Sequence, residues 1–208
     1  MYATMARKSA KPIVRTRFAP SPTGPIQMGN MRTVLFNYLF TKKEEGVFVL
    51  RIEDTDKERS RKEWEQDILE NLQWLGMAWD EGPEKNGPYA PYRQSERTEL
   101  YKKYLEQLLK QGRAYYCFCT PEELEAQRQH QMSLGETPRY TGACRSLSKT
   151  KQDKYLKEGR TAAIRFVVET KMITFQDIIR GSIKFDTGLI GDMVIAKDMN
   201  TPLYNFSV

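Results

Sequence analysis

Ile13-Val-Arg-Thr-Arg-Phe18 is the first of two β-rich runs in this sequence, and Val47-Phe-Val-Leu-Arg-Ile52 is the second. Between them lies the loop Ala19–Gly29, which is rich in proline and glycine, and a helix is predicted from about Asn30 to Gly46. A strand, a loop, a helix and a strand within about forty residues form a βαβ unit with parallel strands. The sequence therefore predicts the first half of a doubly wound, Rossmann-like α/β sheet.

The helix predicted after this loop is amphipathic. Its apolar side chains recur at helical spacing and are Met31, Val34, Leu35, Tyr38 and Leu39. Because they fall on one face, we expect that face to pack against the sheet.

Capping signals and β-rich runs predict the elements that follow. Ser60-Arg-Lys-Glu63 is a capping box, and Ser95 is a candidate cap for the next helix. Thr120-Pro-Glu-Glu123 is a second capping box, with proline at the first helical position. Beyond Arg160 we expect β structure at Ala163–Glu169, a hairpin over Ile178–Ile183, then Met193–Ala196, and a strand over Leu203–Val208. This second region is predicted to be a mixed α+β insertion.

Composition limits the class of protein. The chain has 208 residues, of which 39% are hydrophobic and 29% charged, as in ordinary globular proteins. No run approaches the roughly 20 apolar residues of a membrane span. The start, MYATMARKSAKP, has no apolar segment typical of a secretory signal. We expect a cytoplasmic protein with a flexible N-terminal arm, an organellar presequence being the alternative. The net charge of +6 favours a polyanionic partner.

Histidine and cysteine are both scarce. His130 is the only histidine, so a two-histidine metal site is excluded and no serine–histidine–aspartate triad is evident. The three cysteines, Cys117, Cys119 and Cys144, are an odd number, which argues against a disulfide scaffold. Two neighbouring thiolates followed by a distant one suit tetrahedral zinc, and three free thiols in a metal-free fold are the alternative.

Two segments follow the predicted strands at the sheet edge where open parallel sheets bind ligands. The loop Ala19–Gly29 leads into a helix N-terminus, whose N–H groups and positive dipole suit a phosphate. A purely structural turn is the alternative. Glu53, Asp54 and Asp56 follow the second strand. Carboxylates there can hold an ammonium group, a metal or a ribose, or can form a solvated acidic turn.

A set of motifs extends these local features over most of the chain. It consists of Arg17-Phe-Ala-Pro-Ser-Pro-Thr-Gly24, Arg51-Ile-Glu-Asp-Thr-Asp56, Trp74-Leu-Gly76, Asp80-Glu-Gly-Pro83, Tyr92-Arg-Gln-Ser-Glu-Arg97 and Tyr204-Asn-Phe206. In order and spacing, from about residue 13 to 208, this set resembles glutamyl-tRNA synthetases, which are class I aminoacyl-tRNA synthetases.

The resemblance implies a reaction and its participants. Glutamate attacks the α-phosphorus of ATP, which is bound with Mg²⁺, and the glutamyl group of the resulting adenylate passes to the 3′ end of tRNA(Glu). By carry-over, the glutamate-binding residues are Arg17, Ala19, Ser21, Glu53 and Tyr204. The ATP-binding residues are Thr23, Gly24, Gln27, Gly29 and Asn30. Of these, the candidate catalytic residues are Gln27, Gly29 and Asn30.

The sequence departs from the family at its first signature. The family's His-Ile-Gly-His falls on Gln27-Met28-Gly29-Asn30. A glutamine amide also donates a hydrogen bond but carries no charge. Two hypotheses follow: either Gln27 replaces the histidine fully, or the absence of the histidine costs on the order of 10²–10³ in rate.

The resemblance also implies the remaining zinc ligand. Relatives that include the glutamyl-queuosine synthetases have a Tyr-x-x-x-Cys motif like Tyr140 to Cys144, whereas others have a histidine where this chain has Ser146. We therefore expect a structural zinc held by Cys117, Cys119, Tyr140 and Cys144. His130 is the fallback for Tyr140, and water is a further option.

The predicted organisation follows the family. The expected parts are a flexible arm (1–12), the first half of the Rossmann-like domain (13–93), a connective insertion that binds the tRNA acceptor and zinc (94–203), and the start of the second half (204–208), which is truncated. The expected function is that of a monomeric glutamate–tRNA ligase, although residues 1–208 are not expected to complete the reaction alone. The alternatives are a glutamyl-queuosine tRNA synthetase and a non-catalytic fragment that binds ATP or the tRNA acceptor.

Overall fold

A computed structural model of the chain describes residues 13–177 and 179–208. The expected arm at 1–12 and Ile178 of the expected hairpin therefore lie outside the described residues. The fold is of mixed α/β type, and the chain divides into two compact units between Arg97 and Thr98. Of the helices in the part of the chain that the structure describes, none has both the length and the apolar character needed to span a membrane.

The first unit is built on two parallel strands, β1 (Arg15–Phe18) and β2 (Val47–Leu50), joined by helix α1 (Met28–Lys43). Single parallel bridges, Val49 to Glu81 and Ile52 to Arg93, extend the sheet beyond β2. The other elements of the unit are α2 (Lys62–Trp74) and the 3₁₀ turn η1 (Gln94–Arg97). The predicted βαβ unit is thus present.

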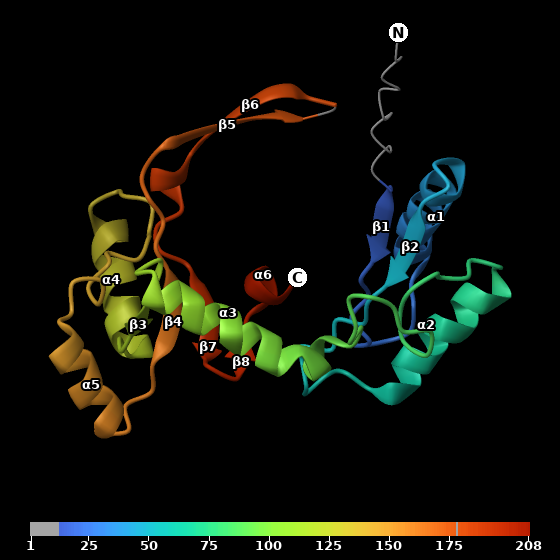
Figure 1. The fold of residues 1–208 in the computed structure, drawn as a ribbon. Helices are drawn as coiled ribbons and strands as arrows, with labels where there is room; N and C mark the ends of the chain where they lie inside the picture. Colours follow the sequence, from blue (N-terminus) through green and yellow to red (C-terminus); the bar gives the residue numbers. More distant parts are fainter. Residues whose placement is uncertain (1–12, 178) are drawn as a thin grey trace, which may run out of the picture. The chain divides into compact units, whose positions relative to one another are not determined.

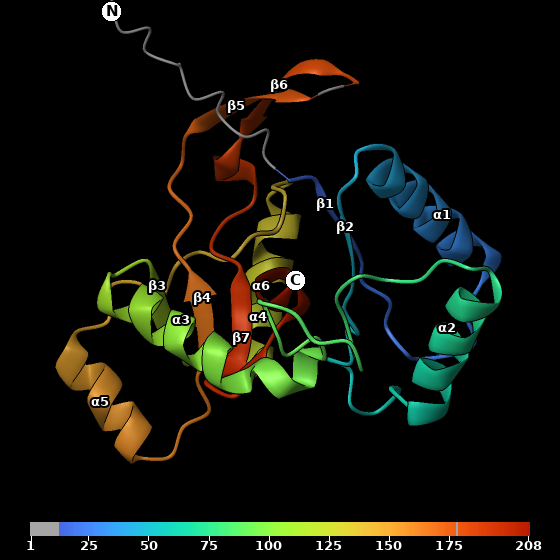
Figure 2. The same cartoon turned by 45° about the vertical axis from the view of Figure 1, so that its right-hand side comes forward.

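Both long helices of this unit cover the same face of the strands, as Figures 1 and 2 show. The core between them is formed by Phe18, Val34, Phe48, Leu50, Ile52, Ile68, Leu69, Leu72, Met77 and Trp79. The predicted apolar face of α1 is correct for Met31, Val34 and Tyr38, which contact this core. It is wrong for Leu35 and Leu39, which are 45% and 55% exposed because they lie on the side of α1 turned away from the strands.

The capping box predicted at Ser60 is wrong, and Ser95 lies inside a helical turn. The N-cap of α2 is Arg61, without a side-chain capping bond, and its amide donates to the Pro22 carbonyl at 3.0 Å. Ser95 lies in η1, which runs directly into the next helix at Thr98, and it donates its amide and hydroxyl to Asp54. By contrast, the box at Thr120 and Glu123 forms as predicted, with Pro121 as the first helical residue.

The second unit contains a four-stranded antiparallel sheet in the order β3-β4-β7-β8. Its strands are β3 (Ala114–Cys117), β4 (Ala163–Phe166), β7 (Val194–Asp198) and β8 (Thr201–Pro202). Helices α3 (Thr98–Lys110), α4 (Pro121–Ser133) and α5 (Lys149–Lys157) belong to the same unit, as does the 3₁₀ turn η2 (Thr187–Leu189). Its core combines Leu105, Ala114, Ile164, Ile195 and Ala196.

A separate hairpin extends away from this sheet, as Figure 1 shows. It pairs β5 (Met172–Asp177) with β6 (Gly181–Asp186). The predicted hairpin was thus correctly located, although its strands are longer than the segment Ile178–Ile183.

The strand expected over Leu203–Val208 is wrong. Residues Tyr204–Ser207 form a helical turn, α6, and Val208 donates its amide to the Tyr204 carbonyl at 3.0 Å. The turn allows Phe206 to pack edge-on against Tyr101, with ring centroids 6.3 Å apart. Burial of this aromatic ring in the second unit therefore overrides the β pattern of the sequence.

Candidate functional site

The loop that follows β1 is held in place by three hydrogen bonds from the rest of the first unit. We call residues 19–27 the active-site loop. The Glu53 amide donates to the Pro20 carbonyl at 2.8 Å, and the Arg61 amide donates to the Pro22 carbonyl at 3.0 Å. The Ile26 amide donates to the Asp67 carboxylate of α2 at 2.8 Å. Because these bonds come from two different segments, the loop has a defined path between β1 and α1.

The predicted catalytic residues lie where this loop becomes helix α1. Gln27 is the N-cap, with an extended backbone and no side-chain capping bond, and Asn30 donates its amide to the Gln27 carbonyl at 2.9 Å. Gln27, Gly29 and Asn30 are exposed, and no atom lies within 4 Å of the position of a Cβ on Gly29. The positive end of α1 is therefore accessible to an anion.

Glu53 is the most unusual acidic residue at this edge. It is only 2% exposed, and its Oε1 accepts a hydrogen bond from Arg51 Nε at 2.7 Å. Its Oε2 is buried and has no hydrogen-bond partner among the described residues. A buried carboxylate oxygen without a partner is costly, and a cationic donor would satisfy it. The arrangement therefore suits an ammonium group.

The other predicted ligand-binding residues divide between the two units. Those of the first unit follow β1 closely: Arg17 is on β1 itself, and Ala19, Ser21, Thr23 and Gly24 are in the active-site loop. Tyr204 belongs to α6 of the second unit and is 61% exposed. The first unit alone thus brings Glu53 and the active-site loop to one edge of the parallel strands.

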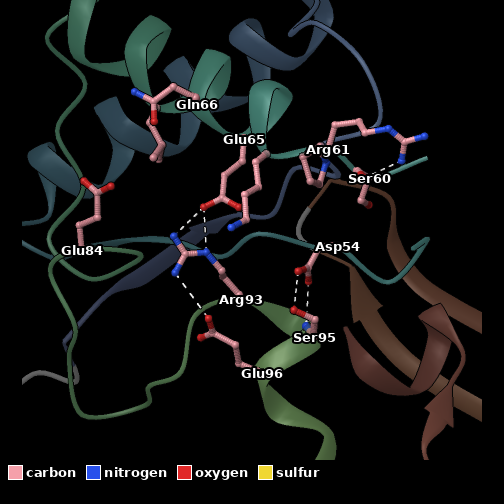
Figure 3. A pocket seen from close by; sticks show the side chains of 12 residues that line it. Asp54, Ser60, Arg61, Glu65, Gln66, Glu84, Arg93, Ser95 and Glu96 are labelled. Atoms are coloured by element: carbon pink, nitrogen blue, oxygen red, sulfur yellow. Dashed lines mark hydrogen bonds and ion pairs between the residues drawn. The ribbon is translucent and has the colours of Figure 1, made fainter. Parts of the chain in front are cut away.

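A polar cavity of about 570 Å³ in the first unit was not predicted from the sequence (Figure 3). Arg93 crosses it, donating from Nε to Glu65 at 2.8 Å and pairing with Glu96 at 3.6 Å. Asp54 accepts two hydrogen bonds from Ser95, from the amide at 2.8 Å and the hydroxyl at 2.5 Å. These contacts tie η1 to α2 and to the segment after β2, so they fix the residue next to Glu53. The motif Tyr92 to Arg97 was the only sequence signal for them.

The second unit brings the three cysteines together, and we call Cys117, Cys119, Cys144 and Tyr140 the cysteine cluster. The three Sγ atoms lie within 4.8 Å of one another. Cys117 ends β3, and Cys119 Sγ is 3.6 Å from Cys144 Sγ. The Tyr140 hydroxyl oxygen is 3.3 Å from Cys117 Sγ and 3.5 Å from Cys119 Sγ. It also accepts a hydrogen bond from the Cys144 amide at 3.0 Å.

These separations fit a tetrahedral zinc ion. With the usual zinc–sulfur and zinc–oxygen bond lengths, two tetrahedral sulfurs lie about 3.8 Å apart and a sulfur and an oxygen about 3.5 Å apart. The 3.6 Å between Cys119 and Cys144 Sγ, and the 3.3 Å and 3.5 Å from the Tyr140 hydroxyl to Cys117 and Cys119 Sγ, lie close to these values. By contrast, His130 lies on the exposed surface of α4 and is outside this group. The fallback assignment of His130 as a ligand is therefore wrong.

Ionisation in the cysteine cluster is uneven. Burial raises the pKa of Cys119 to about 12. Burial, reinforced by the neighbouring thiols, raises the pKa of Tyr140. Burial acts against ionisation of Cys117 too, but the Tyr140 hydroxyl and the Arg165 guanidinium lower its pKa below the usual value. Without a cation the cluster does not hold all its groups as anions, whereas a bound divalent metal would favour thiolates.

Comparisons of this chain with a family model and with known proteins point to the same family. The family model described as tRNA synthetases class I (E and Q), catalytic domain, matches residues 13–208. A glutamate–tRNA ligase of Carboxydothermus hydrogenoformans is 53% identical over 94% of this chain and 41% of its own length. Glutamate–tRNA ligase 2 of Caldanaerobacter subterraneus is 56% identical over 93% of this chain and 40% of its own length. The chain thus spans about 40% of the length of the curated relatives it matches.

A solved structure matches over a similar share of the chain. A glutamate–tRNA ligase from Elizabethkingia meningosepticum, crystallised with its amino acid, has a TM-score of 0.85 and 44% identity. The match covers 93% of this chain and 40% of that protein.

Proposed function

Since this chain belongs to the class I tRNA synthetases for glutamate and glutamine and lies within their catalytic domain, we propose that its protein is a glutamate–tRNA ligase. In this proposal ATP activates L-glutamate to glutamyl-adenylate, which then esterifies the 3′ end of tRNA(Glu) in the cytoplasm. The names of the most similar relatives support glutamate rather than a queuosine tRNA pathway.

We assign three segments of the chain to parts of that larger enzyme. Residues 13–93 are the first half of a doubly wound Rossmann-like domain, and 94–203 are a connective insertion that meets the tRNA acceptor. Residues 204–208 begin the second half. The parallel pairing of β1 with β2 and the crossover helix α1 support this assignment for the first part.

The observation that carries the glutamate proposal is the unpartnered Oε2 of Glu53. The α-ammonium group of glutamate would donate to it, while Arg51 holds the other oxygen. Arg17, Ala19 and Ser21 complete the part of the proposed glutamate site that the first unit carries, and Tyr204 is the glutamate-binding residue that the family pattern assigns to the second unit. A guanidinium is suited to a substrate carboxylate because it donates two parallel hydrogen bonds.

The ATP phosphates are placed by the same proposal at the N-terminus of α1. Thr23, Gly24, Gln27, Gly29 and Asn30 would surround them, and the exposed helix end would attract their negative charge. Mg²⁺ bound with ATP would neutralise part of that charge. No protein nucleophile is needed, so the contribution of these residues is to position the reactants and stabilise phosphate charge.

We also propose that the cysteine cluster holds a structural zinc through Cys117, Cys119, Cys144 and Tyr140. The match to tetrahedral separations supports this ligand set. When bound, zinc would link the end of β3 to the turn around Cys144 and so stabilise a unit with a small apolar core.

The direct test is ATP–pyrophosphate exchange dependent on L-glutamate, measured on the full-length protein with and without tRNA(Glu). Exchange with glutamate but not glutamine supports the proposal, and its absence in a folded protein that binds ATP contradicts it. On residues 1–208, calorimetry with glutamate tests the pocket separately.

The substitution Gln27→His tests the role of the first signature position. An increase of about 10²-fold in exchange rate is expected if the missing charged donor limits the reaction. An unchanged rate would instead show that the Gln27 amide replaces the histidine fully. The substitution Met28→Leu, at the neighbouring exposed position, is the matched control, since it leaves the side chains of Gln27 and Asn30 unchanged.

A further inference from the structure

Arg165 is a buried arginine beside the cysteine cluster. It lies on β4 opposite Tyr115 of β3 and is only 6% exposed. Because side chains two residues apart on a strand share a face, Cys117 lies on the same face of the sheet as Tyr115 and Arg165. The guanidinium carbon of Arg165 is 3.6 Å from the centre of the Tyr140 ring. Arg165 therefore adjoins two members of the cysteine cluster.

The charge of Arg165 is not balanced by a carboxylate. Its NH1 donates to the main-chain carbonyl of Asp192 at 2.8 Å. Its Nε is buried without a hydrogen-bond partner, and no ion pair to an acidic side chain is found for it in residues 13–177 and 179–208. The carboxylate of Asp192 is engaged by the Tyr115 hydroxyl at 2.8 Å, the Val168 amide at 2.8 Å and Arg145 at 3.8 Å. A buried guanidinium without an ion pair is costly, and a nearby anionic group would offset part of that cost.

The proposed metal centre has the opposite imbalance. Three thiolates and a phenolate around a divalent ion leave a net charge of about −2. A cation stacked on the ring of the tyrosine ligand reduces this excess without occupying a coordination position.

We propose that Arg165 is a positioning residue of the metal centre, which holds the Tyr140 ring in place and balances the negative charge of the bound ligand set. This inference rests on the zinc site proposed above. It assigns to β4 a part in metal binding although Arg165 is not itself a ligand.

Zinc affinity measured by competition with a chromogenic chelator tests this role on the whole chain. Arg165→Met keeps an unbranched apolar stem but removes the planar charge. We expect it to weaken zinc binding by on the order of 10–100-fold, the usual effect of losing a partner of a metal ligand. Arg165→Lys keeps the charge without the planar stacking, so we expect a smaller loss.

Arg160→Met is the matched control. Arg160 stacks on the ring of Tyr155 at 3.9 Å in the same unit and pairs with Glu158 at 3.0 Å. It makes the same type of contact outside the cysteine cluster, so its loss should leave zinc affinity unchanged. Equal zinc affinities in Arg165→Met, Arg160→Met and the wild-type protein would overturn the inference.

Melting temperatures with and without chelator separate metal binding from general destabilisation. If Arg165 acts through the metal, Arg165→Met reduces the difference between the two melting temperatures. If it only supports the sheet, both temperatures fall equally, and the inference is wrong. A wild-type protein that binds no zinc would remove the metal centre itself, whereas zinc binding that is insensitive to Arg165→Met would remove only the role of Arg165.

Discussion

The active-site loop and the cysteine cluster are positioned in different ways. The loop accepts hydrogen bonds from the Glu53 and Arg61 amides and donates one to the Asp67 carboxylate, so the protein supplies every partner. The cluster gathers thiols and a phenol beside a guanidinium, and the thiols would become anionic ligands when a metal cation binds. The loop is thus positioned by the folded chain alone, whereas the cluster is the site of the proposed zinc ion.

This difference predicts that the two units respond to different variables. The first unit should depend on carboxylate ionisation, because its ties are acid–amide and acid–arginine contacts. The second should depend on metal supply. All three tryptophans, Trp64, Trp74 and Trp79, lie in the first unit, so their fluorescence reports on that unit alone.

Cys144→Ser should have the largest effect, because it removes a buried thiol of the proposed zinc site. Structural zinc contributes about 10–16 kcal/mol of apparent binding free energy in small domains, so a loss of several kcal/mol is expected in the second unit. Hydrogen exchange should accelerate in peptides of β3 and β4, while tryptophan fluorescence stays unchanged. Ser146→Ala, at an exposed position in the same turn, is the control. Equal rates of hydrogen exchange for β3 and β4 in both variants would argue against a metal-dependent unit.

Glu53→Gln should be next, and its effect should be confined to the first unit. The loss of a charge-assisted hydrogen bond to the substrate ammonium is expected to weaken glutamate binding on the order of 10–100-fold. Calorimetry with L-glutamate measures this change. Glu84→Gln, at an exposed acidic position of the same unit, should bind as the wild type does. A similar loss in both variants would remove the specific role of Glu53.

Glu81→Gln tests the dependence of the first unit on carboxylate ionisation. Arg15 donates to both oxygens of Glu81, at 2.8 Å and 2.7 Å, and Tyr92 donates at 2.6 Å. The hydrogen bonds from Arg15 lower the pKa of Glu81 in the folded state, although burial acts in the opposite direction. Loss of this charged contact should reduce the unfolding free energy at neutral pH by about 1–3 kcal/mol.

The sign of the pH effect follows from that lowered pKa. The unfolded carboxyl binds a proton near its ordinary pKa of about 4.3, before the folded one does. The stabilisation is therefore present above this value and is lost as the pH falls through the lower folded pKa. Denaturant unfolding followed by tryptophan fluorescence should show a flatter acid limb for Glu81→Gln. If the unfolding free energies of Glu81→Gln and the wild-type protein fall equally with decreasing pH, this contribution of Glu81 is contradicted.

Thr120→Ala should have the smallest effect and lies next to the cysteine cluster. Thr120 and Glu123 exchange hydrogen bonds of 3.2 Å and 2.9 Å at the start of α4. Removing the cap should cost about 1 kcal/mol in chemical denaturation, with zinc affinity nearly unchanged. A large loss of zinc affinity in Thr120→Ala would mean that the start of α4 helps to place Cys119.

Local patterns in the sequence predicted the structural features that depend on residues close together in the chain. The βαβ unit, the cap at Thr120 and the association of the three cysteines follow from spacing and residue type. The helix predicted to start at Ser60 starts one residue later, at the N-cap Arg61, whose amide donates to Pro22, a residue distant in sequence. Ser95 likewise bonds to the distant Asp54. Arg165 carries no motif at all. Its position beside Tyr140 depends on antiparallel pairing with Tyr115, fifty residues earlier in the chain.

The division of the chain at Arg97 also orders the events of protein synthesis. Each unit is continuous in sequence, so every contact within the first can form once residue 97 has left the ribosome. At about 5–20 residues per second, the remaining 111 residues, from 98 to 208, take roughly 6–20 s to appear. During that interval the contacts between β1, β2 and the loop after β1 can already form, while β3 still awaits β4, its partner in the sheet.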